Sequence, residues 1–210
     1  MMNGLRGAIV GSPVSHSLSP LLHSKAFEFL GIEGSYQREE IGEDQLGDFF
    51  SERAGEFDYL SLTMPLKEIA LTLPVAIDST AIRIQSANTL FRRGEQWHLT
   101  STDGSGFISA LENAGRQSFT KVLVLGAGGT ARAVVGALDG KAEEISVLGR
   151  TSTRREVLEA SVSQSEFEYL RWNDSPGFGQ YDLVVNTTPA GAADLLADSC
   201  LLYTSPSPRD

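Results

Sequence analysis

The sequence has little of what disulfide-rich, membrane-spanning or nucleic-acid-binding proteins need. Its single cysteine, Cys200, excludes a disulfide framework and a cysteine metal site, and fits a reducing cytoplasm. No apolar run approaches the roughly 20 residues that span a bilayer, and residues 1–7 lack the apolar core of a secretory signal. With a net charge of −10 and no basic run, the chain is a poor candidate for binding nucleic acid or an anionic membrane.

Candidate metal ligands are scarce as well. His23 and His98 have no metal-ligand spacing with an acidic partner, and His16 is expected to be structural. We therefore predict no metal. What the chain does have is 210 residues, 41% of them hydrophobic, which is enough for one large or two small domains with real cores.

A glycine-rich turn lies near the middle of the chain, at Gly126-Ala-Gly-Gly-Thr-Ala131. Apolar residues 122–125 precede it and a helical run at 130–138 follows, as in a strand-turn-helix unit. Gly126 permits a tight turn, Gly128 lets a pyrophosphate approach the backbone, and Ala131 lets the helix pack closely. Free N–H groups at the helix start would face the phosphates. The pattern predicts a dinucleotide site, with a plain structural turn as the alternative.

Two arginines follow the next expected strand, 144–149. An NAD site usually has an acidic residue about 20 residues after the glycines, for the ribose 2′-hydroxyl. This chain has Arg150 there and Arg154 four residues later. Guanidinium groups bind phosphate oxygens bidentately, and arginines near a helix N-terminus otherwise oppose the helix dipole. The sequence therefore predicts NADP rather than NAD, and ordinary solvated charges are the alternative.

Strand and helix patterns alternate along the chain. From about residue 121 they run strand-helix-strand-helix, with further strands at 167–172 and 182–186, which predicts a parallel sheet. The first hundred residues alternate without a glycine fingerprint. In that half the expected strands are 7–11, 35–41 and 58–64, the expected helices 19–30, 44–54 and two short ones after Pro65, and the expected hairpin 87–92 with 96–100. A helix at 104–114 leads into the second half. The predicted fold class is α/β, an N-terminal α/β domain followed by an incomplete Rossmann-type domain.

Polar side chains follow several strands of the first half, at 12–19, at 63–67, at Asn88 and at 101–104. Ligands of α/β folds gather at the carboxyl ends of strands, so these groups are expected to converge. Hydroxyls, an amide, an amine and a carboxylate suit a polyhydroxylated carboxylic acid, and Lys67 beside Asp103 can move a proton. The alternatives are helix-capping roles for Ser19 and Asp103, and a solvated Lys67.

These segments resemble the shikimate dehydrogenase family, the NADP-dependent enzymes of chorismate and aromatic amino-acid biosynthesis. They occur in the family's order with similar spacing and cover the chain to about residue 190. The matching segments are His16-Ser-Leu-Ser-Pro20, Thr63-Met-Pro-Leu-Lys67, Ala87-Asn-Thr-Leu90, Thr102-Asp-Gly-Ser-Gly-Phe107, Gly126-Ala-Gly-Gly-Thr-Ala131, Arg150-Thr-Ser-Thr-Arg154 and Asn186-Thr-Thr-Pro189.

The resemblance implies roles for individual residues. Ser17 and Ser19 hold the substrate carboxylate, while Lys67 and Asp103 form the catalytic pair, in which the Lys67 ammonium donates a proton as hydride reaches the carbonyl carbon. The residues implied to bind the substrate are Ser17, Ser19, Thr63, Lys67, Asn88 and Asp103. Those implied to bind NADP are Gly126, Ala127, Gly128, Gly129, Thr130, Ala131, Arg150, Thr151 and Arg154.

The implied reaction is the reversible, NADPH-dependent reduction of 3-dehydroshikimate to shikimate. One alternative is a quinate/shikimate dehydrogenase that uses NAD or NADP, although NAD-using members should favour an acidic residue near position 150. Another is a shortened, inactive chain that only binds ligand. No nucleic-acid or membrane partner is expected, and a homodimer is left open.

Residues 200–210 have no place in this pattern, and we interpret them as a non-native tail, with a natural tail as the alternative. The expected domains are 1–102 for substrate binding and catalysis, 103–199 for an incomplete NADP-binding domain, and 200–210 for the tail. The resemblance also implies a further family segment, with a glutamine, a tyrosine and the remaining cofactor contacts, that this chain lacks.

Overall fold

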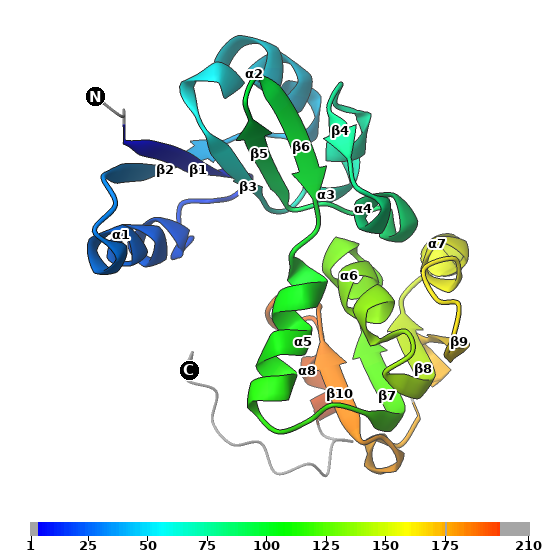
Figure 1. Cartoon of the computed structure of the whole chain (residues 1–210). Helices are drawn as coiled ribbons and strands as arrows, with labels where there is room; N and C mark the ends of the chain where they lie inside the picture. Colours follow the sequence, from blue (N-terminus) through cyan, green and yellow to red (C-terminus); the bar gives the residue numbers. More distant parts are fainter. Residues whose placement is uncertain (1–3, 175, 198–210) are drawn as a thin grey trace. The chain divides into compact units, whose positions relative to one another are not determined.

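The computed structural model describes residues 4–174 and 176–197. The chain divides into two compact units between Thr102 and Asp103, and each unit has its own sheet and core (Figure 1). The expected tail at 200–210, with Cys200, lies outside the described residues. None of the helices within the described ranges is long and apolar enough to cross a membrane.

The first unit is built on a six-stranded mixed sheet in the order β2-β1-β3-β5-β6-β4. Strand β1 is parallel to both β2 and β3, whereas β5 is antiparallel to β3 and β6, and β4 is parallel to β6. The carboxyl ends of β1 and β3 therefore share one edge with the start of β5. The strands are β1 (Leu5–Gly11), β2 (Gly34–Glu40), β3 (Tyr59–Leu62), β4 (Ala76–Ile77), β5 (Thr89–Arg93) and β6 (Gln96–Thr100).

The helices of this unit follow the predicted pattern with two differences. Helix α1 begins at Ser19, so Leu18 occupies the capping position without a side-chain hydrogen bond, and the capping role considered for Ser19 is wrong. Strand β4 was not predicted, because two residues are too few to show an alternating pattern. The helices are α1 (Ser19–Leu30), α2 (Leu46–Arg53), α3 (Leu66–Ile69) and α4 (Ser79–Ile84), with 3-10 turns η1 (Glu43–Gln45), η2 (Ala54–Glu56) and η3 (Ala70–Thr72).

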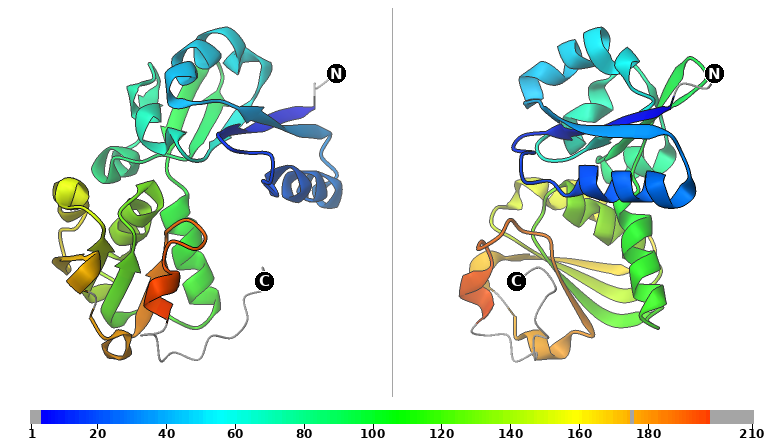
Figure 2. Two further views of the ribbon diagram at one scale, coloured as in Figure 1. Left: turned by 180° about the vertical axis from the view of Figure 1, so that it is seen from behind. Right: turned by 90° about the vertical axis from the view of Figure 1, so that its left-hand side faces the viewer.

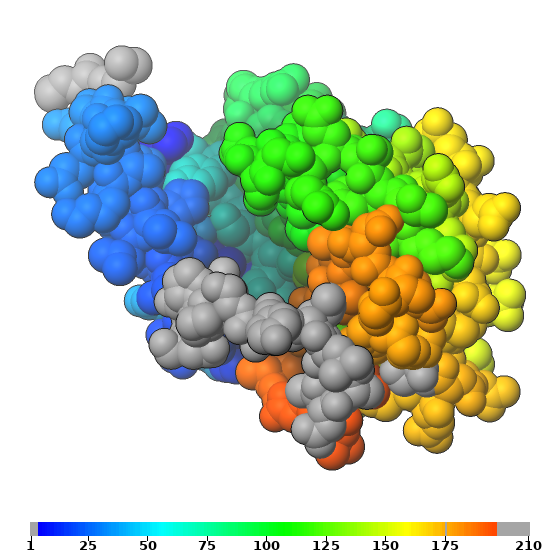
Figure 3. Space-filling model, turned by 90° about the horizontal axis from the view of Figure 1, so that it is seen from below, coloured from blue at the N-terminus to red at the C-terminus, as the bar shows by residue number. Residues whose placement is uncertain are grey.

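The core of the first unit lies mainly on one face of its sheet. There Val10, Leu60 and Leu90 from three strands pack with Phe49 of α2 and Leu66 of α3. A smaller cluster on α1, β1 and β2 joins Ile9, Phe27 and Tyr36. The outer side of α1 is apolar but exposed, at Leu18, Leu22 and Phe29; this part of the chain is blue in Figure 3.

The second unit is built on an all-parallel sheet in the order β10-β7-β8-β9, as the Rossmann-type prediction requires. The chain runs outward from β7 through β8 to β9 and then crosses back to place β10 on the other side of β7. Ligands of such sheets bind at this switch in strand order, outside the carboxyl ends of β7 and β10. The strands are β7 (Phe119–Leu125), β8 (Ala142–Gly149), β9 (Glu166–Arg171) and β10 (Leu183–Asn186).

Both faces of the parallel sheet are covered, which explains why the β7 sequence is an unbroken apolar run rather than an alternating one. Val122, Val124 and Ile145 pack with residues of α5, α6 and α7 on one face. Leu123 packs on the other face in a cluster that includes Leu196 of α8. Figure 2 shows helices on both sides of these strands. The helices are α5 (Asp103–Asn113), α6 (Gly129–Leu138), α7 (Arg155–Glu159) and α8 (Asp194–Ala197), with 3-10 turns η4 (Ser152–Arg154), η5 (Trp172–Asp174) and η6 (Phe178–Gln180).

Helix α5 starts one residue earlier than predicted. Asp103 is its first helical residue. Gly104 is buried against α6, where a Cβ atom would lie 2.6 Å from the carbonyl oxygen of Ala133. Only glycine permits this close approach between the two helices, which ties the start of α5 to α6.

Candidate substrate and cofactor sites

The ends of β1 and β3 are held together by their backbones. Thr63 donates its N–H to the carbonyl of Val10 at 2.9 Å, and Ser12 donates to the carbonyl of Met64 at 3.0 Å. The predicted ligand Thr63 is partly buried at this edge of the sheet. The structure therefore joins the loop that carries the serines to the loop that carries Lys67.

Lys67 and Asn88 are brought together in the same way. Lys67 is a partly buried residue of α3, and its carbonyl accepts a hydrogen bond from the N–H of Ala87 at 2.8 Å. The Asn88 side chain binds Thr102 twice: Oδ1 accepts from the Thr102 N–H at 2.8 Å, and Nδ2 donates to its Oγ1 at 3.0 Å. Asp103, also partly buried, follows directly in the chain. Residues from three predicted motifs thus meet through short hydrogen bonds.

The predicted serine pair is connected as well. Ser17 Oγ donates to Ser19 Oγ at 3.2 Å and accepts from the Ser19 N–H at the same distance. Both serines are partly buried, whereas His16, which was expected to be structural, is exposed.

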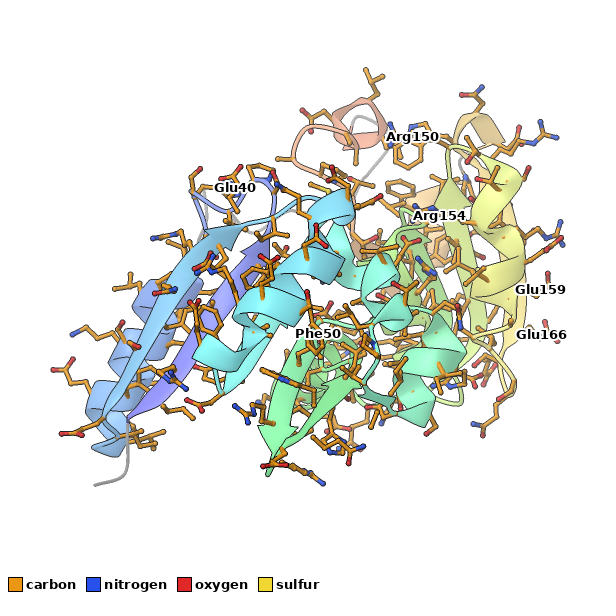
Figure 4. All side chains as sticks on the ribbon, turned by 90° about the horizontal axis from the view of Figure 1, so that it is seen from above. Glu40, Phe50, Arg150, Arg154, Glu159 and Glu166 are labelled. Carbon is orange, nitrogen blue, oxygen red and sulfur yellow. The ribbon has the colours of Figure 1, made fainter. Side chains whose placement is uncertain are left out.

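The serine loop rests on strand β2. The Arg38 guanidinium donates to the carbonyl of Ser17 at 2.7 Å, and Ser12 Oγ donates to Glu40 at 3.2 Å. Glu40 is labelled in Figure 4. Sequence reasoning missed Arg38 because it lies on an edge strand and belongs to no motif. Its guanidinium adds positive charge beside a loop predicted to bind a carboxylate.

The glycine turn of the second unit has the backbone that a pyrophosphate needs. Gly126 has a φ of +104°, and a Cβ atom there would lie 2.7 Å from Thr187 Oγ1 at the end of β10. At Gly128 a Cβ atom would meet nothing within 4 Å, so the backbone is open to a ligand. Helix α6 begins at the next residue and its N-terminal N–H groups favour an anion. These features fit a dinucleotide at the switch in strand order.

The predicted arginines lie next to this turn. Arg150 and Arg154 are exposed residues that follow the end of β8, in the segment that leads into α7. The Arg154 guanidinium donates to the carbonyl of Ala127 at 3.5 Å, so the arginine segment and the glycine turn are in contact. In Figure 4 the two arginines lie near each other and away from Glu159 and Glu166. The arrangement suits a 2′-phosphate on the nucleotide.

A residue outside every motif, Tyr169 of β9, contacts the arginine segment. Its hydroxyl donates to the carbonyl of Thr151. Burial raises the pKa of Tyr169, while the positive charge of Arg154 acts in the opposite direction. No sequence signal marks this tyrosine, because its partner is a backbone atom.

No group of three or more His, Cys, Asp or Glu side chains that could hold a metal occurs in the described part of the chain.

Comparison with known proteins places both units in one family. A family model described as the shikimate dehydrogenase substrate binding domain matches residues 9–90. A second, described as shikimate / quinate 5-dehydrogenase, matches residues 109–198.

Individual relatives are similar over most of the chain. A shikimate dehydrogenase (NADP(+)) of Thermus thermophilus is 40% identical over 190 residues, which is 90% of this chain and 70% of that protein. The protein of the same name from Methanocella arvoryzae is 38% identical over 187 residues, which is 87% of this chain and 68% of the relative. The crystal structure of shikimate 5-dehydrogenase from Thermus thermophilus in complex with NADP(H) and shikimate has a TM-score of 0.76 at 35% identity, covering 88% of this chain and 68% of that one.

Proposed function

Because the chain belongs to the shikimate dehydrogenase family, we propose that it catalyses the reversible, NADPH-dependent reduction of 3-dehydroshikimate to shikimate. In this proposal residues 1–102 bind the substrate and residues 103–199 bind NADP. The proposal assigns the molecule to the oxidoreductases that interconvert a hydroxyl and a carbonyl group.

The first unit supplies polar groups for a substrate with hydroxyls and a carboxylate. We assign the carboxylate to Ser17 and Ser19, whose hydroxyls are already aligned with each other, with Arg38 holding the backbone of Ser17. We assign the ring hydroxyls to Thr63, Asn88 and Asp103. The paired hydrogen bonds between Asn88 and Thr102 fix the orientation of the Asn88 amide, which limits the loss of side-chain entropy on binding.

The second unit supplies the cofactor site. When bound, NADPH provides the hydride that reduces the substrate carbonyl. The open backbone at Gly128 and the start of α6 would hold the pyrophosphate, and Arg150, Thr151 and Arg154 would bind the 2′-phosphate. The remaining members of the proposed cofactor set are Gly126, Ala127, Gly129, Thr130 and Ala131.

Lys67 completes the reaction by moving a proton. In the direction of reduction, its ammonium donates a proton to the carbonyl oxygen of the substrate, which becomes a hydroxyl group. In the reverse direction, its amine accepts the proton of that hydroxyl group. In this proposal the carboxylate of Asp103 orients the Lys67 ammonium.

The observation that carries the proposal is the hydrogen-bonded linkage of the Lys67, Asn88 and Thr102 segments, because it unites a proton donor, an amide and the residue before a carboxylate. The test is a spectrophotometric assay of NADPH oxidation with 3-dehydroshikimate, together with calorimetric titration of NADP and shikimate. Turnover supports the proposal. Binding of both ligands without turnover supports the binding-only alternative, and binding of neither rejects both.

One observation favours quinate as a second substrate. The family model that matches the second unit is described for shikimate and quinate together. Quinate carries the same carboxylate and ring hydroxyls that the first unit is proposed to bind. Oxidation of quinate at a rate comparable to that of shikimate would identify a quinate/shikimate dehydrogenase, and a preference for NAD would contradict the role of Arg150.

Location and assembly are part of the proposal as well. We propose that the protein is cytoplasmic, and leave its assembly as monomer or homodimer to measurement. Light scattering on the purified chain determines its mass in solution.

A further inference from the structure

The arginine segment after β8 is braced by a tyrosine from the neighbouring strand. Strands β8 and β9 are parallel, with Tyr169 opposite Val147. The tyrosine side chain extends along the sheet beyond its own partner, and its hydroxyl donates to the carbonyl of Thr151. Thr151 lies between Arg150 and Arg154, so the bond holds the middle of the segment that carries both guanidinium groups.

The glycine that ends β8 makes room for this contact. A Cβ atom built on Gly149 would lie 1.8 Å from the Tyr169 hydroxyl oxygen and 2.6 Å from the ring carbon that bears it. Gly149 is buried, with the tyrosine ring where a side chain would otherwise be. The pairing of these two residues is therefore specific: glycine at 149 is what allows a tyrosine at 169 to reach past the strand end.

The braced segment also contacts the glycine turn. Arg154 donates to the carbonyl of Ala127, and its charge acts on the Tyr169 phenol, so the guanidinium, the phenol and the turn are neighbours. A brace at this point affects the arginines more than the pyrophosphate site, because the turn has its own backbone bond to β8, from the Gly126 N–H to the Leu148 carbonyl at 2.9 Å.

We propose that Tyr169, seated against Gly149, is a positioning residue that sets the preference for NADP over NAD by fixing the Arg150–Thr151–Arg154 segment around the 2′-phosphate. The inference rests on the proposed function, since it needs the second unit to bind NADP. Tyr169 contacts the backbone of Thr151 and acts through that segment. A segment that is held in place before binding loses less conformational entropy when it binds the 2′-phosphate. NAD has no 2′-phosphate, so its affinity does not depend on how this segment is held.

A purely structural role for Tyr169 predicts a different result. Its side chain packs against the core cluster of the second unit that contains Val147 and Leu158. If packing were its only role, removing the hydroxyl would change stability and leave the ratio of NADP to NAD affinity as it was.

The experiment compares the chain with Tyr169→Phe by calorimetric titration of NADP and NAD. We expect NADP to bind about 3- to 10-fold more weakly, the effect of losing one hydrogen bond, and NAD to bind unchanged. Gly149→Ala should have the same selective effect, because its methyl group displaces the phenol. In a Tyr169→Ala background the Gly149→Ala change should add nothing, since the clash is gone.

The matched control is Tyr181→Phe, the same change at another largely buried tyrosine of the second unit, which should leave the ratio unchanged. Thermal unfolding of each variant confirms that it is folded. Loss of NADP and NAD affinity by equal factors in Tyr169→Phe, or no loss of either, overturns the inference. If the unaltered chain does not prefer NADP, both the proposed cofactor and this inference are wrong. If the unaltered chain prefers NADP and Tyr169→Phe keeps the same preference, only this inference is wrong.

Discussion

The two units recognise their proposed ligands with different parts of the chain. In the second unit the turn at Gly126 and Gly128 presents backbone groups, and Arg150 and Arg154 add charged side chains beside it. In the first unit side chains from separate loops are brought together by a mixed sheet, and Asn88 and Thr102 hold each other in place. A backbone site accepts any nucleotide with a pyrophosphate, whereas a side-chain site selects the pattern of hydroxyls on one substrate.

This difference separates the consequences of mutation. Changes in the second unit should affect stability or cofactor affinity, depending on whether the altered glycine shapes the turn or faces the nucleotide. Changes in the first unit should affect substrate affinity or turnover with little effect on the cofactor.

The largest expected effect is on the proton donor of the first unit. Lys67→Ala should lower kcat by about 10²- to 10⁴-fold, the usual contribution of general acid catalysis, with NADP affinity unchanged. Stopped-flow and steady-state NADPH oxidation measure the rate, and calorimetry measures the affinity. Lys25→Ala, at an exposed lysine of α1 paired with Glu28, is the control and should keep full activity. Loss of NADP binding in Lys67→Ala would break the division of roles between the units.

Two glycines of one turn should separate folding from binding in the second unit. Gly126→Ala forces a Cβ atom onto a φ of +104° and against Thr187, so we expect the free energy of unfolding to fall by about 1–3 kcal/mol. Gly128→Ala meets open space, so stability should hold while NADP binds more weakly because the methyl group obstructs the pyrophosphate.

Urea denaturation and calorimetry of both variants check this pair. A Gly128→Ala chain that binds NADP normally would show that the pyrophosphate does not approach this residue. Equal destabilisation by the two changes would contradict the separation of the shaping glycine from the binding one.

The amide of the first unit should matter less than the lysine. Asn88→Ala removes the bonds to Thr102 and the proposed hydroxyl contact, and we expect the KM for shikimate to rise by about 10-fold, as for one or two hydrogen bonds. NADP affinity should not change. Gln96→Ala, at an exposed amide at the start of β6, is the matched control. A rise in the NADP Kd for Asn88→Ala alone would mean that the side-chain site and the backbone site are not independent.

The smallest expected effect is a pH dependence that belongs to the second unit. The backbone N–H groups of Lys121 and Thr120 donate to Asp182 and hold the pKa of that carboxyl below its ordinary value of 3.8. Because the folded pKa is lowered, the contribution to stability is present above about pH 4 and is lost as the pH falls through the folded pKa.

In Asp182→Asn, the free energy of unfolding should therefore fall less steeply as the pH is lowered below about 4. Urea denaturation between pH 2.5 and 7, on the order of the range over which a carboxyl titrates, measures it by the fluorescence of Trp172 in the second unit. An unchanged slope would show that the carboxylate does not stabilise the start of β10. Because the group is exposed, the difference will be small.

The site of the second unit was easier to predict from the sequence than the site of the first unit. Gly126, Gly128, Arg150 and Arg154 lie within one strand-helix-strand unit, so their relation is local and spacing alone predicts a nucleotide site. Helix α1 was also predictable, because Gly31 ends it in a left-handed conformation.

The substrate site was harder, because Ser17, Lys67, Asn88 and Asp103 are far apart in sequence. Residue chemistry indicated a polar cluster, and only the resemblance to a family suggested a role for each member. Arg38 and Tyr169 could not be predicted, since each binds a backbone carbonyl and such contacts leave no pattern in the sequence. The short strand β4 was missed because two residues show no alternating pattern, and the cap of α1 because Leu18 has no side-chain hydrogen bond that marks the position.

The strand order of the second unit has a consequence for how it assembles. Neighbours β7, β8 and β9 follow one another in the chain, but β10 must return to β7, and Asp182 and Thr120 are 62 residues apart. Closing so long a loop is entropically expensive and is repaid only when the strand docks. We therefore expect β10 to be the last strand to join and the first to leave, so that its amide protons exchange with solvent before those of the other three strands.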